Sequence, residues 1–106
     1  MGIFDLYKTP DINEGVKNFN NTAKAVLVDV RTTGEYASGH IPGSHNVPLD
    51  NLGRIDDVGP DENTPVFEYC LSGGRSGRAV SMIKQMGYTN VTNIGGISAY
   101  RGKVEK

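Results

Sequence analysis

Four short apolar segments of the chain predict β-strands. The segment 25–30 (AVLVDV) is almost continuously apolar and rich in valine, which is typical of a strand buried on both faces of a parallel sheet. The segments 44–49 (SHNVPL), 64–70 (TPVFEYC) and 90–94 (NVTNI) predict three more strands, and Pro48 ends the first of these.

Helical spacing of apolar residues appears between these segments. Thr9 is expected to cap a first helix with Pro10 at its first position, and the apolar face follows at Ile12, Val16 and Phe19. Residues 32–38 predict a short helix, because Thr32 and Glu35 have the spacing of a capping box and Gly39 suits its C-terminal end.

Two more helical segments follow. Residues 74–86 predict a helix that Gly87 ends, with apolar residues at Ala79, Val80, Ile83 and Met86. A short helix is expected near 52–55 and one further helical turn after residue 95. Strands alternating with helices predict an α/β fold, with a parallel sheet covered by helices and right-handed crossovers. The length of 106 residues suits one domain spanning 1–106.

Charge and composition exclude several classes of partner. Eleven basic and twelve acidic residues give a net charge of −1, so we expect neither nucleic acid nor an anionic membrane surface as partner. No apolar run approaches the ~20 residues of a membrane span, and the first residues lack a signal-peptide pattern. The expected location is therefore cytoplasmic. A single cysteine excludes an internal disulfide and a cysteine-built metal site.

The single cysteine lies in the segment 69–77, YCLSGGRSG, where a predicted strand meets a predicted helix. Ligands of open α/β sheets bind at this edge. Glycines such as Gly73 and Gly74 let a loop curl so that its backbone N–H groups form a nest for an anion, assisted by the helix dipole. In such a nest Cys70 is expected to ionise well below the ~8.5 of a free thiol, with Arg75 adding a positive charge nearby. A lone intracellular cysteine is most often a small buried apolar residue, but the glycines, the arginine and the junction together favour a reactive thiolate.

Several other polar residues are expected to have structural roles, and for Asp29 and Arg31 a functional role is also open. Asp29 and Arg31 follow the first core strand and either support the cysteine loop or form a structural salt bridge. Glu35 is expected to be a helix cap, His40 a structural residue and His45 an exposed strand residue. The spacing of His40 and His45 with Cys70 matches no strong zinc pattern, so we expect no metal and no cofactor.

Three motifs resemble the rhodanese-like domains. These are residues 29–49 (DVRTTGEYASGHIPGSHNVPL), the loop 70–76 (CLSGGRS) and the closing segment 87–102 (GYTNVTNIGGISAYRG). The resemblance implies a single rhodanese-like domain with a parallel sheet of about five strands and helices on both faces. It also implies that Cys70 is a nucleophile carrying a sulfane sulfur as a persulfide. By the same resemblance, Leu71, Ser72, Gly73, Gly74 and Arg75 form the cradle around the transferred sulfur.

Loop length distinguishes two chemistries within this resemblance. Related dual-specificity cell-cycle phosphatases and some arsenate reductases have five residues between cysteine and arginine, whereas this chain has four. The smaller ring favours a single sulfur atom over a tetrahedral oxyanion. Many single-domain relatives carry arginine directly after the cysteine, where this chain has Leu71, so thiosulfate is expected to be a poor donor. Tyr100 replaces a frequent tryptophan, which we interpret as a packing change.

Three functions remain open. The first is a sulfurtransferase that moves sulfur from a small anion, thiosulfate or a persulfide, to cyanide or an external thiol. The second is a persulfide carrier that works with a partner protein and has little turnover on small molecules. The third is a non-catalytic module whose loop binds an anion or a peptide.

Overall fold

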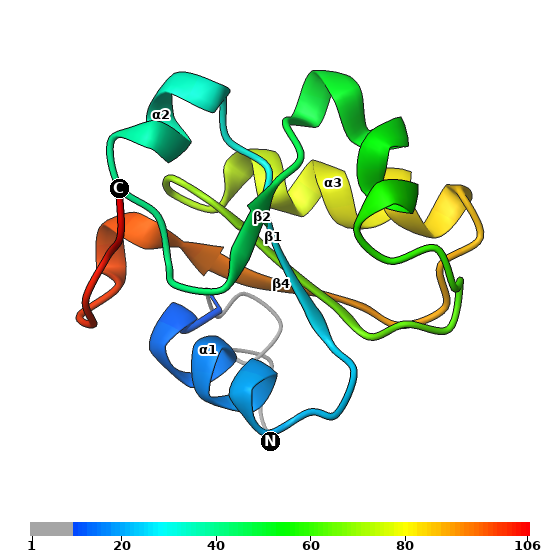
Figure 1. The fold of residues 1–106 in the computed structure, drawn as a ribbon, viewed down its shortest axis with the longest axis horizontal. Coiled ribbons are helices and arrows are strands. Elements are labelled where there is room, and N and C mark those ends of the chain that lie inside the picture. The colour runs from blue at the N-terminus through cyan, green and yellow to red at the C-terminus, as the bar shows by residue number, and fades with distance from the viewer. Residues whose placement is uncertain (1–9) are drawn as a thin grey trace, which may run out of the picture.

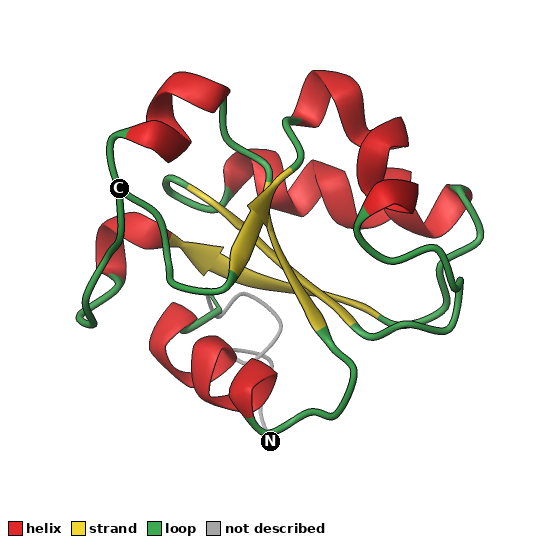
Figure 2. Ribbon diagram, viewed as in Figure 1, coloured by secondary structure: helices red, strands yellow, loops and turns green. Residues whose placement is uncertain are grey.

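Four parallel strands form the centre of the fold, in the spatial order β2-β1-β3-β4 (Figures 1 and 2). The computed structural model describes residues 10–106, so the predicted cap Thr9 lies outside the described residues. The strands are β1 (Val26–Asp29), β2 (Ser44–Asn46), β3 (Val66–Cys70) and β4 (Val91–Gly96). The predicted parallel α/β sheet is therefore confirmed, with four strands in the described residues rather than about five. Outside these strands, the further pairing in residues 10–106 is an isolated antiparallel bridge between His40 and Glu105.

Helices cover both faces of the sheet, as predicted (Figure 2). Helix α1 (Ile12–Asn20) packs on one face, mainly against β4 and β3, and the short 3₁₀ helix η3 (Ile97–Ala99) lies beside it. Helix α3 (Gly74–Gln85) packs on the other face against β3 and β4 and contacts the 3₁₀ helix η2 (Leu49–Asp57). The short helix α2 (Thr33–Ala37) follows β1. None of the helices in residues 10–106 has the length and apolar character needed to span a bilayer.

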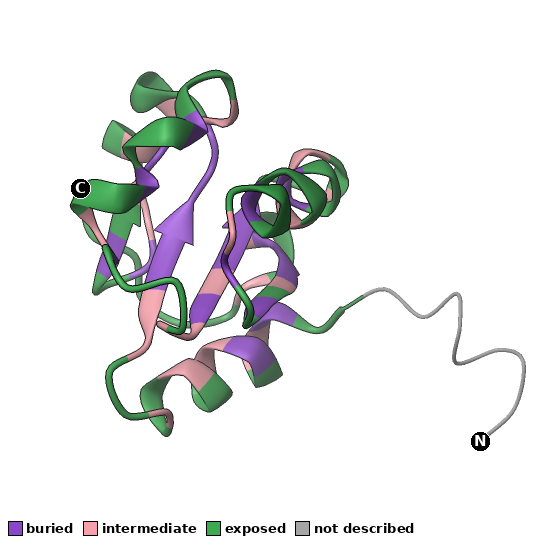
Figure 3. Cartoon of the chain, turned by 90° about the vertical axis from the view of Figure 1, so that its right-hand side faces the viewer, coloured by how far each residue is buried: buried purple, intermediate pink, exposed green. Residues whose placement is uncertain are grey.

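The alternation of side chains along β1 and β3 produces two hydrophobic cores. Val28, Val66 and Cys70 face α3 and η2, whereas Leu27 and Tyr69 face α1. Because β1 and β3 are interior strands, both of their faces are covered, and all their residues are buried except Val26 and Phe67, which are partly buried (Figure 3). Burial on both faces explains why segment 25–30 is almost continuously apolar instead of alternating.

Several predicted boundaries shift; the strand predicted over 44–49, for example, ends at Asn46. Helix α1 begins at Ile12 rather than at Pro10, because the Asp11 carboxylate accepts a hydrogen bond from the Asn13 backbone N–H at 3.0 Å and so forms the cap. The helix expected near 52–55 is part of the longer η2, which contains a kink at Asn51. Strand β4 continues past its predicted end, since its last glycines still pair with β3.

Candidate active site

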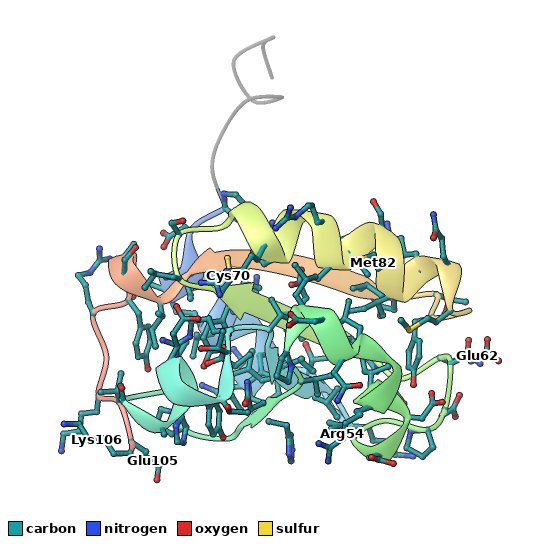
Figure 4. The ribbon with its side chains drawn as sticks, turned by 90° about the horizontal axis from the view of Figure 1, so that it is seen from above. Arg54, Glu62, Cys70, Met82, Glu105 and Lys106 are labelled. Carbon is teal, nitrogen blue, oxygen red and sulfur yellow. The ribbon has the colours of Figure 1, made fainter. Side chains whose placement is uncertain are left out.

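Cys70 is the last residue of β3, and α3 begins at Gly74, so the thiol lies at the predicted strand-to-helix junction (Figure 4). The residue is only 1 % exposed. Its side chain belongs to the core on the α3 side of the sheet. A reaction partner of this thiol must therefore be small at its reacting end.

The loop after Cys70 curls back onto the sulfur. Gly73 has φ +108°, a left-handed conformation that glycine adopts without the steric cost of a side chain. In this conformation its backbone N–H donates a hydrogen bond to Cys70 Sγ at 2.9 Å. The expected nest of N–H groups is thus formed at the N-terminus of α3, a helix of twelve residues.

Ser76 is a site residue that the sequence analysis missed. Its side chain is fully buried, and its Oγ lies 3.4 Å from Cys70 Sγ and 3.1 Å from the Gly73 carbonyl oxygen. The thiol can donate to the hydroxyl oxygen, and once the sulfur is ionised the hydroxyl can turn its proton toward it. The available signal was a small hydroxyl residue in the first turn of α3, on the side that faces the loop.

Opposing effects set the pKa of Cys70. Burial raises it, whereas hydrogen bonds from the Ser76 hydroxyl and from the backbone N–H groups of Ser76, Gly73 and Ser72 lower it. The net result is a pKa below the ordinary value of a thiol, in the predicted direction. The main lowering groups are this hydroxyl and these amides. The sequence analysis expected the amides, with Arg75 as an added charge, but not the hydroxyl.

Arg75 lies in an ion pair rather than free beside the sulfur. Its two terminal nitrogens donate to the Glu35 carboxylate at 2.7 and 2.9 Å, which joins the start of α3 to α2. The Arg75 guanidinium and the Thr32 backbone N–H lower the pKa of Glu35 to about 2. Glu35 also completes the predicted capping box with Thr32. The positive charge of Arg75 is therefore largely compensated by Glu35.

Strand β4 supports the loop from the side. Gly96 pairs with Cys70, and a Cβ on Gly96 would collide with the Leu71 carbonyl oxygen and lie 2.6 Å from the Cα of Ser72. The backbone N–H of Ser98 donates to that same carbonyl oxygen at 3.0 Å. Glycine at position 96 thus lets the loop lie directly against β4.

The remaining predicted cradle residues line the rim of the loop. Leu71 is 43 % exposed, which is unusual for a leucine in a chain with two well-filled cores. Ser72 and Gly74 are also exposed. The rim of the loop therefore presents an apolar side chain at position 71.

Asp29 and Arg31 do not contact the cysteine loop through any hydrogen bond found in residues 10–106. They bond to each other, with Arg31 Nη2 2.7 Å from Asp29 Oδ2, and Arg31 also donates to the Gly39 carbonyl oxygen. Asp29 pairs with Tyr69 across the sheet, and the Arg31 guanidinium lies 5.9 Å from the Tyr69 ring centroid. Of the two interpretations of this pair, the structural salt bridge fits the contacts.

The histidines have structural surroundings. His40 stacks on the Tyr36 ring with a centroid separation of 3.7 Å, and its Nδ1 lies 2.9 Å from the Tyr36 carbonyl oxygen. His45 is exposed on β2, as expected. Within the described part of the chain, no group of three or more His, Cys, Asp or Glu side chains is arranged to hold a metal ion.

The sequence and the fold have close counterparts among known proteins. The chain is 41 % identical over 71 residues to the thiosulfate sulfurtransferase PspE of Escherichia coli, a match that covers 66 % of this chain and 68 % of that one. It is 39 % identical over 84 residues to the uncharacterised protein YqhL of Bacillus subtilis, covering 77 % of this chain and 65 % of that one.

A solved structure described as a rhodanese with anions from E. coli superimposes with a TM-score of 0.72 at 36 % identity, covering 77 % of this chain and 98 % of that chain. The crystal structure of a rhodanese-like domain protein from Staphylococcus aureus gives the same TM-score at 28 % identity, covering 92 % and 96 %. The model of the rhodanese-like domain matches residues 13–103. The chain therefore belongs to the rhodanese-like domain family.

Proposed function

We propose that this protein is a sulfurtransferase in which Cys70 carries a sulfane sulfur as a persulfide. The observation that carries the proposal is the Cys70 sulfur itself, held by the Gly73 N–H at 2.9 Å inside a loop with four residues between cysteine and arginine. Amide donors stabilise the negative charge on sulfur before and after transfer. The near-complete burial of the thiol supports a single sulfur atom, rather than a larger group, as the part that is transferred.

The reaction has two steps. The Cys70 thiolate attacks the outer sulfur of thiosulfate, the bond between the two thiosulfate sulfurs breaks, and sulfite leaves with the electron pair. The outer sulfur of the resulting persulfide is then attacked by cyanide or an external thiolate, and Cys70 leaves as the thiolate. Because Cys70 is the only cysteine of the chain, the acceptor thiol comes from another molecule.

An assay with thiosulfate and cyanide tests the proposal directly. We expect thiocyanate to form with the unmodified protein and none to form with Cys70→Ser. Intact-protein mass spectrometry after incubation with thiosulfate should show one added sulfur on the unmodified protein only. Absence of both turnover and added sulfur, with thiosulfate and with a persulfide donor, would leave the non-catalytic binding module as the explanation.

A persulfide carrier acting with a partner protein is the second candidate, and the rim of the loop favours it. Leu71 is exposed there and the Arg75 charge is compensated by Glu35, so a thiosulfate dianion finds little positive charge. Leu71→Arg should raise kcat/KM for thiosulfate about tenfold, which corresponds to ~1.4 kcal/mol from one partly exposed charge-assisted contact.

This gain should shrink at high salt, because exposed charges are screened. Steady-state kinetics of both proteins at low and high ionic strength measure it, with Leu71→Met as the uncharged control. An unchanged kcat/KM at low salt for Leu71→Arg would mean that position 71 does not contact the donor.

A further inference from the structure

Glu68 is a buried carboxyl that neither the fold nor the sulfur chemistry described above uses. It lies in the middle of β3, between β1 and β4, and its side chain is 0 % exposed. Both carboxyl oxygens are buried, and neither has a hydrogen-bond partner in the described residues. A carboxylate in this position would pay the full cost of leaving water, so the group is expected to keep its proton.

Cys70 is the next residue on the same face of the same strand. Side chains two residues apart on a strand point to the same side, so Glu68 and Cys70 both face α3. The core between them is apolar on the side of Glu68: Val28 lies opposite Glu68 on β1, and α3 contributes Ala79 and Ile83 to this core. In such surroundings two negative charges are screened poorly.

Other charged groups lie away from this face. On β1, Asp29 points to the opposite face and is paired with Arg31. On β4, the neighbour of Glu68 is the neutral Asn93, whose side-chain oxygen accepts from the Gly95 N–H.

The titratable side chains of α3, η2 and the segment after α3 are exposed, or are bonded to other groups. They are Arg75 with Glu35, Arg78, Lys84, Asp50, Arg54, Asp56, Asp57 and Tyr88, the last with its hydroxyl donating to Asp56 and the Gly59 carbonyl. Cys70 is thus the titratable group that faces Glu68.

We propose that Glu68 and Cys70 share one negative charge: the Glu68 carboxyl stays protonated while the Cys70 thiolate is present, and its ionisation makes that thiolate more basic. Glu68 acts through Cys70 and is not itself in contact with a substrate. Burial, and next the charge of Cys70, raise the pKa of Glu68 to about 9, which agrees with this arrangement. Since coupling between two sites is reciprocal, an ionised Glu68 must also raise the pKa of Cys70.

The coupling has a consequence for sulfur transfer, which rests on the proposed function. When the thiolate becomes a persulfide, its charge moves to the outer sulfur, about 2 Å further along the S–S bond. The repulsion from an ionised Glu68 then weakens. Ionisation of Glu68 therefore favours the sulfur-loaded form over the free thiolate.

The test uses the free thiolate, so it is independent of sulfur transfer. Alkylation of Cys70 by neutral iodoacetamide is followed between pH 6 and 9.5 by mass spectrometry of the Cys70 peptide, with far-ultraviolet circular dichroism at each pH. In the unmodified protein the alkylation rate should rise as the Cys70 thiol ionises and rise again near pH 9, when Glu68 ionises and makes the thiolate more basic. Because nucleophilicity follows basicity with a Brønsted slope of ~0.4–0.5, the second rise should be about threefold for each pKa unit of coupling. Glu68→Gln, which imitates the protonated carboxyl, should match the unmodified rate at pH 7 and lack the second rise.

Glu14→Gln is the matched control, because Glu14 is exposed on α1 across the sheet, and it should retain both rises. Superimposable profiles for Glu68→Gln and the unmodified protein would overturn the proposal. A difference in alkylation rate between Glu68→Gln and the unmodified protein at pH 7 would also overturn it, since Glu68 would then already be ionised at that pH.

A second measurement needs no change at position 68. In protein labelled with ¹³C at the glutamate carboxyls, one resonance should remain protonated at pH 7 and titrate at alkaline pH. In Cys70→Ser the same resonance should titrate at lower pH, because the thiolate charge is gone. A carboxyl resonance that titrates at the same pH in both proteins, or no glutamate protonated at pH 7, contradicts the shared charge even if Glu68→Gln fails to fold.

Discussion

Each face of the sheet buries one carboxyl, and the two carboxyls have opposite surroundings. On the α1 face, Asp29 is 0 % exposed and is held by Arg31, with the guanidinium in turn bonded to the Gly39 carbonyl. On the α3 face, Glu68 is equally buried and has no partner among the described residues. Burial alone therefore does not decide whether a carboxyl is charged; the partner that reaches it does.

The largest expected effect comes from removing the partner on the α1 face. Arg31→Met keeps much of the apolar stem of the side chain but leaves the Asp29 carboxylate buried without a counter-charge. The free energy of unfolding at pH 7 should fall by ~3–5 kcal/mol, as for other broken buried ion pairs. Urea unfolding measures it, with the exposed Arg78→Met as a control expected to change stability by less than ~0.5 kcal/mol. A loss below about 1 kcal/mol would mean that Asp29 does not depend on Arg31.

On the α3 face, we expect a substitution of the buried carboxyl to raise the free energy of unfolding rather than lower it. Glu68→Met removes a carboxyl that has to be protonated in the folded protein but ionises in the unfolded chain, whose pKa is near 4.5. At pH 7 this difference amounts to ~3 kcal/mol, so the variant should unfold at a higher urea concentration. Glu14→Gln is the control on an exposed position. If Glu68→Met proves less stable at pH 7, the carboxyl contributes a favourable interaction, which would make the two faces alike.

The pH dependence of the free energy of unfolding tests the protonation of Glu68 more closely. Because the pKa of Glu68 is raised in the folded protein, to about 9, its effect is absent below about pH 4.5 and destabilises the fold progressively above it. The stability gap between Glu68→Met and the unmodified protein should widen by ~1.4 kcal/mol for each pH unit from about 5.5 to 8. Unfolding curves at four pH values in this interval measure the slope. A gap that stays constant with pH would show that Glu68 is ionised in the folded state.

The smallest effect is expected at a carboxyl that is only partly buried. The Glu35 side chain is 30 % exposed and the Arg75 side chain 29 %, so water screens their ion pair. Glu35→Gln should lower the free energy of unfolding at pH 7 by no more than ~1 kcal/mol. Urea unfolding beside Arg31→Met makes the comparison direct. A loss as large as that of Arg31→Met would mean that the pair linking α2 to α3 behaves like a buried one.

Local patterns of the sequence determined the elements and the position of Cys70 at the end of a strand. Short apolar segments indicated β1 and β3, the capping box indicated α2, and the glycines after Cys70 indicated a curled loop that the structure contains. These features depend on backbone preferences and on hydrogen bonds between residues a few positions apart. For the same reason the boundaries of β1, β3 and α2 were close to the predicted ones. Helix α1 starts later than predicted, where Asp11 is the cap, η2 and β4 extend further, and β2 is shorter.

The tertiary structure decided which charges the site contains. Glu35 and Arg75 are 40 residues apart in the chain, and only the packing of α2 beside the start of α3 brings them together. That Glu68 shares a face with Cys70 follows from strand alternation, but that no donor reaches it depends on β1, β4, η2 and α3 all presenting apolar or neutral side chains there. The charge of a buried group depends on everything packed around it, which no short stretch of sequence contains.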